Sequence, residues 1–199
     1  MRRLNTLLSL ALLLASAGLA ARASAQAQTF KVDSKSSSIQ FVSDAPLEKF
    51  TGKSTNLSGD MTVDPNATGS AKGDVKCEVA SIKTNVALRD QHLAGENWLD
   101  AKKYPQARFV ITKVSGPAKL NPNEVTELTV NGKFTLHGVT KDVSTKAKIR
   151  YTPGAQGALH VLASFTVHLE DYKVSIPSIV ALKVSPDIVI NVDRRATSG

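Results

Sequence analysis

The residue types best suited to acid–base or phosphate chemistry meet in one short segment, where Arg89, Asp90 and His92 lie within four positions of one another. A histidine can exchange a proton near neutral pH, and the planar guanidinium of an arginine suits the oxygens of a phosphate. A structural interpretation explains the same residues: Asp90 caps a helical turn or pairs with Arg89, and His92 packs against its surroundings. We favour the structural interpretation and keep Arg89 and His92 as candidate contacts for the polar end of a ligand.

The other residues with catalytic or metal-binding potential are dispersed. His160 and His168 share a face of one predicted strand, but eight residues of strand separate them by about 26 Å, too far to hold one metal ion. Cys77 is the only cysteine and alternates in step with Val75, which predicts a buried apolar position. The sequence contains no Gly-x-Ser-x-Gly motif. We therefore predict no catalytic residue, no metal site and no cofactor.

The first 25 residues have the three regions of a secretory signal peptide. Arg2 and Arg3 precede an apolar run over 7–14, and small residues follow at 21–25. The apolar run is shorter than the ~20 residues that a membrane-spanning helix needs. We expect cleavage near Ala25, export to the periplasm, and a single domain over residues 26–199.

The distribution of charge argues against a nucleic-acid partner. The chain has 25 Lys and Arg against 17 Asp and Glu, for a formal net charge of +8. Its basic residues are scattered along predicted strands and are not interleaved with aromatic residues, as they would be in a nucleic-acid groove. A scattered basic surface is compatible with transient contact with an anionic membrane surface. The oligomeric state stays open, with a homodimer as one option.

Most of the chain after residue 25 alternates apolar and polar residues, which is typical of strands with one buried face. The clearest case is Val130–Leu136, where Val130, Phe134 and Leu136 share one side. Turn sequences rich in Gly, Pro and Asn separate the segments and are short enough for antiparallel hairpins. The pattern predicts about eight or nine strands, over residues 30–33, 39–42, 57–63, 75–82, 109–114, 130–136, 143–151, 161–169 and 188–192.

The interval Val86–Tyr104 breaks this alternation. Its apolar residues have helical spacing, Gly95 interrupts it and Pro105 ends it. We predict two short helical turns that form a functional segment or a lid over one end of the sheet.

Alternation alone leaves two architectures open, a sandwich of two sheets and a closed barrel. An outer-membrane pore is disfavoured, because only 5% of the residues are aromatic and the polar face is dense in lysine. A closed barrel of about eight strands would have room for one small or elongated ligand. Taken alone, the predicted buried face would simply fill a core. It comprises Phe41, Met61, Val75, Val79, Phe109, Ile111, Phe134, Leu136, Phe165 and Val167.

Several motifs resemble those of the bacterial YceI-like family. The run NGKFTLHGVTKDV at 131–143 is similar to the family's G-x-L-T-x-H-G-V-T-K-x-V segment. RDQHL at 89–93, WLDA at 98–101 and YPQARF at 104–109 resemble its R-D-x-H-L, F-D-A and Y-P-x-x-x-F patterns. The resemblance extends from about residue 29 to residue 195, with its segments in the same order.

The resemblance implies an extended, lipocalin-like, closed antiparallel barrel in the periplasm whose apolar tunnel binds a polyisoprenoid chain. On this interpretation the predicted buried face is the wall of the tunnel, and Leu93 and Trp98 lie at its mouth. Arg89 and His92 are the candidate contacts for the head group of the ligand. Trp98 stands where the family commonly has Phe, and the larger side chain would narrow or cap the tunnel.

We therefore expect a periplasmic protein that sequesters or carries a polyisoprenoid or an isoprenoid quinone, without catalysis. Two alternatives come from other classes of function. An enzyme acting on a lipid or acyl substrate would need a clustered acid, base or nucleophile. A structural or interaction module would have a filled core and no internal ligand.

Overall fold

The computed structural model describes residues 26–198, so the predicted signal peptide at 1–25 lies outside the described residues. All ten strands form one antiparallel sheet: β1 (Gln28–Val32), β2 (Ser38–Asp44), β3 (Lys49–Ser54), β4 (Leu57–Val63), β5 (Lys72–Glu78), β6 (Gln106–Ser115), β7 (Val125–Leu136), β8 (Val139–Thr152), β9 (Ala158–His168) and β10 (Asp187–Ser198). The helical elements are α1 (Ala87–Ala94) and short 3-10 helices at Thr68–Ser70, Val79–Ser81, Leu169–Tyr172 and Ser178–Val180.

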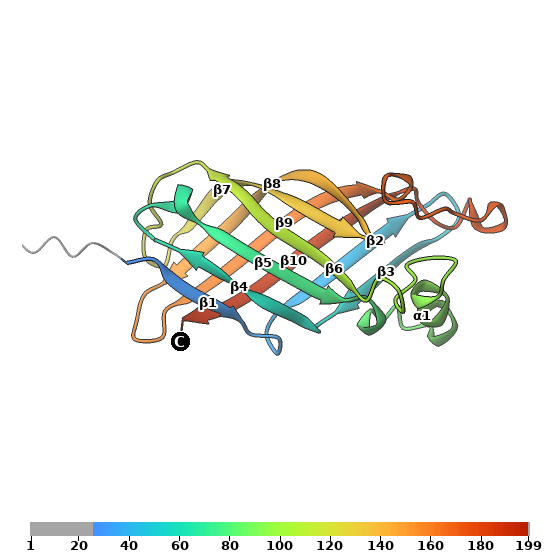
Figure 1. Cartoon of the computed structure of the whole chain (residues 1–199), viewed down its shortest axis with the longest axis horizontal. Helices are drawn as coiled ribbons and strands as arrows, with labels where there is room; N and C mark the ends of the chain where they lie inside the picture. The colour runs from blue at the N-terminus through green and yellow to red at the C-terminus, as the bar shows by residue number, and fades with distance from the viewer. Residues whose placement is uncertain (1–25, 199) are drawn as a thin grey trace, which may run out of the picture.

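The sheet closes on itself into a barrel (Figure 1). The ring runs β1-β4-β5-β6-β7-β8-β9-β10 and returns to β1. β10 pairs with β2 along Ile188–Asp193 and with β1 along Ala196–Ser198, so β1 and β2 occupy one interrupted position in the wall. β3 and β4 share the next position in the same way, because they pair with β2 and β1 respectively. The wall therefore has eight strand positions, which confirms the predicted closed antiparallel barrel.

The inward faces follow the predicted alternation. On β7, Val130, Phe134 and Leu136 are buried, and on β10 the buried residues are Ile188, Ile190, Arg194 and Ala196. β10 extends past the predicted end at Val192, because its last residues hydrogen-bond to β1 and β9.

Two strand predictions need correction. The strand β3 escaped prediction because two of its three inward positions, Gly52 and Ser54, are not large apolar residues, so the alternation stops after Phe50. A Cβ on Gly52 would overlap the ring of Phe41, so the small residue makes room for that ring. The strand predicted over 75–82 ends at Glu78, and a turn of 3-10 helix takes its place from Val79.

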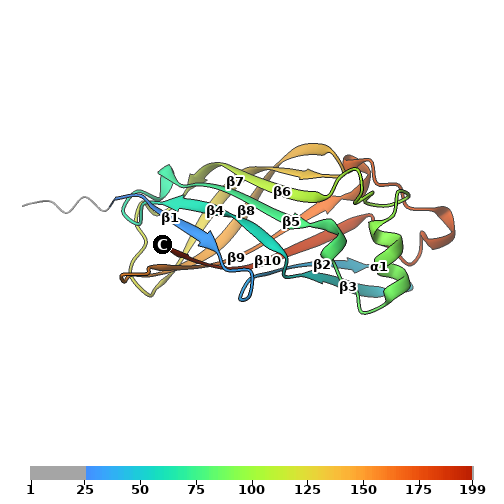
Figure 2. The same ribbon diagram turned by 60° about the horizontal axis from the view of Figure 1, so that its bottom comes forward.

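One end of the barrel carries most of the irregular structure. Figures 1 and 2 show α1 and the connection between β9 and β10 side by side beyond the strand ends. The predicted lid segment thus folds as one helix, α1, followed by turns that end at Pro105. Among the described residues, no helix has the length and apolar character needed to cross a bilayer.

Candidate ligand-binding cavity

A cavity of about 680 Å³ occupies the end of the barrel beneath α1, and we call it the wide cavity. Its wall combines inward residues of the strands, such as Phe41, Phe134 and Ile190, with residues of α1 and of the β9–β10 connection. The lining is largely apolar, and Glu48, Arg89, His92, Lys183 and the Cys77 thiol are its charged or titratable members. The barrel is therefore hollow at this end.

A second cavity of about 130 Å³ continues toward the opposite end, and we call it the narrow cavity. It lies between the strands and the segments that carry Thr68 and Leu120. Four residues line both cavities: Ile39, Cys77, Ala107 and Phe134. These four form a waist at which the two spaces adjoin.

Eleven of the twelve predicted tunnel residues line one or both cavities. The wide cavity has Phe41, Leu93, Trp98, Leu136 and Val167; the narrow cavity has Met61, Val75, Phe109, Ile111 and Phe165; Phe134 borders both. Val79 is the exception. It is buried in the core from the 3-10 helix after β5, where the strand alternation that placed it inward no longer applies.

Arg89 and His92 both line the wide cavity, as a head-group contact would require. The Nη1 of Arg89 donates to Oε1 of Glu48 at 2.9 Å, and its guanidinium lies 4.3 Å from the centre of the Phe50 ring. Arg89 therefore already has an anionic and an aromatic partner, which fasten α1 to the β2–β3 hairpin. The predicted alternative of an Arg89–Asp90 pair is not what forms.

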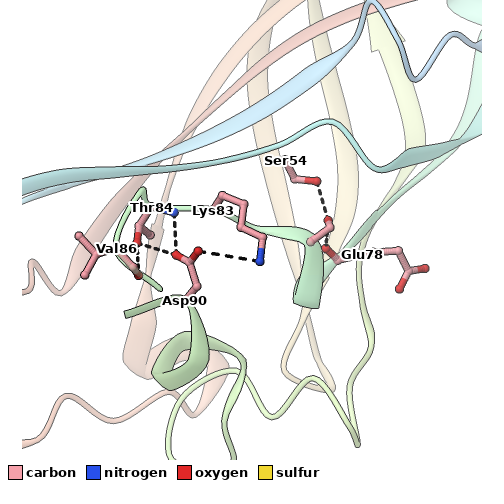
Figure 3. A network of polar contacts seen from close by, with 7 residues as sticks. Ser54, Glu78, Lys83, Thr84, Val86 and Asp90 are labelled. Carbon is pink, nitrogen blue, oxygen red and sulfur yellow. Dashed lines mark hydrogen bonds and ion pairs between the residues drawn. The ribbon is translucent and has the colours of Figure 1, made fainter. Parts of the chain in front are cut away.

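Asp90 instead anchors the start of α1 (Figure 3). Its Oδ1 accepts hydrogen bonds from the backbone N–H of Thr84 at 2.7 Å and from the Thr84 hydroxyl at 2.6 Å. These bonds hold the pKa of the Asp90 carboxyl below its usual value, with a smaller contribution from Lys83. Asp90 is thus not the N-cap, which is Val86, but a tether between the first turn of α1 and the preceding segment.

The segment before α1 is in turn fixed to the barrel wall. Lys53 and Lys83 exchange backbone hydrogen bonds of 2.8 and 2.9 Å, which adds this segment to the free edge of β3. The Ser54 and Ser81 hydroxyls also bond to each other at 2.7 Å (Figure 3). α1 is therefore held over the wide cavity through both its own side chains and its approach segment.

Sequence reasoning missed the β9–β10 connection as part of the site. Val174, Pro177, Ile179, Val180 and Val184 of this connection line the wide cavity. The density of apolar residues over 174–184 is a signal that the sequence offers, but it has no strand alternation and so does not indicate a barrel wall.

The described residues bring together no group of three or more His, Cys, Asp or Glu able to hold a metal ion. Cys77 is buried at the waist as predicted, and burial raises the pKa of its thiol. The geometry of the cavities is thus that of an apolar container with few polar groups.

Comparison with known proteins shows the family to which this barrel belongs. A family model for the YceI-like domain matches residues 30–196. The chain belongs to the YceI family. A UPF0312 protein of Pseudomonas putida (strain W619) is 32% identical over 142 residues, which are 70% of this chain and 71% of that protein.

Two solved structures share the YceI barrel. BcnA of Burkholderia cenocepacia superimposes with a TM-score of 0.70 at 23% identity, over 83% of this chain and 99% of that one. A polyisoprenoid binding domain from Saccharophagus degradans gives a TM-score of 0.69 at 16% identity, over 86% and 99% of the two chains. At these identities the likeness is one of fold.

Proposed function

We propose that this YceI-family protein binds one long apolar chain, a polyisoprenoid or an isoprenoid quinone, inside the barrel and carries it through the periplasm. The observation that supports this most directly is the wide cavity of about 680 Å³, which adjoins the narrow cavity at the waist. Together they make an elongated apolar space, matched in shape to a chain and not to a compact polar molecule.

The chemistry of the lining suits such a ligand. Burial of apolar surface contributes about 25 cal/mol per Å², so a long chain can bind without directional contacts. The polyisoprenoid named for the Saccharophagus degradans domain, which has the same fold, supports the same class of ligand here.

The mouth of the wide cavity offers a route for exchange with a membrane. Leu88 and Ile179 line the wide cavity and are 60% and 90% exposed. Leu47 and Leu182, each next in sequence to a lining residue, are 68% and 60% exposed. The backbone bond from Leu47 N–H to the Leu182 carbonyl, at 2.9 Å, brings two of these residues together. Exposed apolar patches of this kind mark interaction sites with membranes or proteins. We propose that this rim touches the membrane surface when the chain enters or leaves.

The first experiment identifies the bound chain. The exported protein is purified without detergent, extracted with organic solvent and analysed by mass spectrometry for long-chain isoprenoids. The stripped protein is then titrated with a quinone while the emission of Trp98 is followed, since Trp98 is the only tryptophan and lines the wide cavity. We expect saturable binding and a spectral shift.

Uptake by a Trp98→Phe variant, measured by extraction, serves as the control for the fluorescence signal. Folded protein that repeatedly comes out empty and takes up neither quinone nor prenol would overturn the proposed function.

A further inference from the structure

Arg194 lies at an unexpected position inside the barrel. It belongs to β10, where it faces inward with Ile190 and Ala196, and it lines the narrow cavity. It is 2% exposed, although an arginine is almost never fully buried unless its charge is paired. The neighbouring Arg195 points outward and is exposed, as the alternation of the strand requires.

The guanidinium of Arg194 has no partner among the residues that the structure describes. Its Nε, Nη1 and Nη2 atoms are all buried and none hydrogen-bonds to a protein atom. The nearby polar side chains are already engaged: Thr68 donates to the Pro117 carbonyl and Thr145 to the Ser164 carbonyl, both at 2.7 Å. Five donor hydrogens of a cation thus face an apolar space.

Nearby charges do not neutralise it. Asp60 attracts the guanidinium electrostatically, but it is exposed and accepts no bond from it. Burial lowers the pKa of Arg194 to about 10, so the side chain stays charged at neutral pH. A buried, unpaired charge is strongly unfavourable, and an anion placed against it would remove much of that cost.

We propose that Arg194 binds an acidic group, a carboxylate or a phosphate, at the leading end of the chain that occupies the barrel. This proposal rests on the proposed function and specifies its ligand as an acidic lipid. The ligand enters with its acidic end first, passes the waist, and leaves its apolar tail in the wide cavity beneath α1. The planar fork of arginine pairs with either anion through two parallel hydrogen bonds. The narrow cavity, at about 130 Å³, has room for a small group of this kind.

This orientation reverses the one predicted from the sequence, which placed the polar end at Arg89 and His92. Arg89 is already paired with Glu48 at the mouth, whereas Arg194 is unpaired at the far end. Of the two arginines, only Arg194 is buried without a hydrogen-bond partner among the described residues.

The test compares three ligands with the same chain: oleic acid, oleyl phosphate and oleyl alcohol. Each is titrated into stripped wild-type protein, Arg194→Met and the matched control Arg195→Met, with Trp98 emission as the readout. We expect at least one acid to bind the wild type and Arg195→Met about tenfold or more tightly than the alcohol does. Arg194→Met should lose that preference and still bind the alcohol. The acid that is preferred identifies the carboxylate or the phosphate.

A second measurement reports on the contact itself. With ¹³C-labelled oleic acid, the bound carboxyl should titrate below its ordinary pKa in wild type, because the cation favours the carboxylate, and should lose this shift in Arg194→Met. If the alcohol binds wild type as tightly as both acids, or the preference survives in Arg194→Met, Arg194 is not the anchor. If none of the three ligands binds wild type while quinone does, the acidic anchor is ruled out and the proposed function stands; if quinone is not taken up either, the proposed function itself fails.

Discussion

Replacement of Arg194 by methionine should stabilise the empty protein. Burial lowers the pKa of Arg194 from its ordinary value to about 10, and each tenfold loss of proton affinity corresponds to about 1.36 kcal/mol. Because the folded state binds the proton less tightly than the unfolded state, the penalty is complete below pH 10 and disappears as the pH rises from about 10 to the ordinary pKa of an arginine. At neutral pH the buried charge therefore costs about 3 kcal/mol. Methionine fills a similar volume without a charge, so Arg194→Met should recover about that amount.

The measurement is urea unfolding of stripped protein at pH 7, with Arg195→Met as the control that removes an exposed arginine from the next position. The midpoint of Arg194→Met should rise while the slope stays unchanged, and Arg195→Met should lie within about 0.5 kcal/mol of wild type. Saturation with the preferred acidic ligand should stabilise wild type far more than Arg194→Met. A clear loss of stability in empty Arg194→Met would mean that the guanidinium has a favourable partner in the folded state, and the reasoning would be refuted.

Three further predictions follow from the cavities and their supports. Ala107→Phe should fill the waist, so long ligand chains should bind this variant more weakly, while chains short enough for the wide cavity should keep their affinity. If the variant binds every length in a series of chains as tightly as wild type does, the two cavities do not form one continuous path. Gly132→Ala should lower the free energy of unfolding in urea by about 1–3 kcal/mol, because the new Cβ would lie 2.6 Å from the Val110 carbonyl oxygen and overlap the Phe109 ring. The control Gly69→Ala should be close to neutral, because its Cβ would have no atom nearer than 3.8 Å. Hydrogen bonds from Thr84 lower the pKa of Asp90, so the stability that Asp90 gives to α1 should be complete above its ordinary pKa of 3.8 and be lost as the pH falls through its lowered pKa. Hydrogen exchange in α1 should therefore rise at acidic pH in wild type. In Asp90→Ala it should already be raised at neutral pH.

Local periodicity along the chain is enough to predict the inward faces of most strands and the place of the helical segment. Alternation on β7 and β9 assigned Phe134, Phe165 and Val167 to the interior, and all three line the cavities. The loss of alternation at 86–104 located the helical segment over the mouth. Period-two patterning works here because each strand has one face toward the interior along its whole length. Where the chain leaves the strand conformation, at Val79, the side chain is buried in the core but lines neither cavity.

Strand pairing and the size of the internal space depend on contacts between segments far apart in the chain. Closure depends on β10 meeting both β1 and β2, a contact between the two ends of the domain that no local pattern encodes. That pairing extends β10 beyond Val192, the predicted end of the strand, and turns Arg194 inward, where it is buried. The cavities likewise arise from the distance between opposite walls, which the number and stagger of the paired strands set. Residue types select the inward face, and only the closed ring of hydrogen bonds fixes how much space that face surrounds.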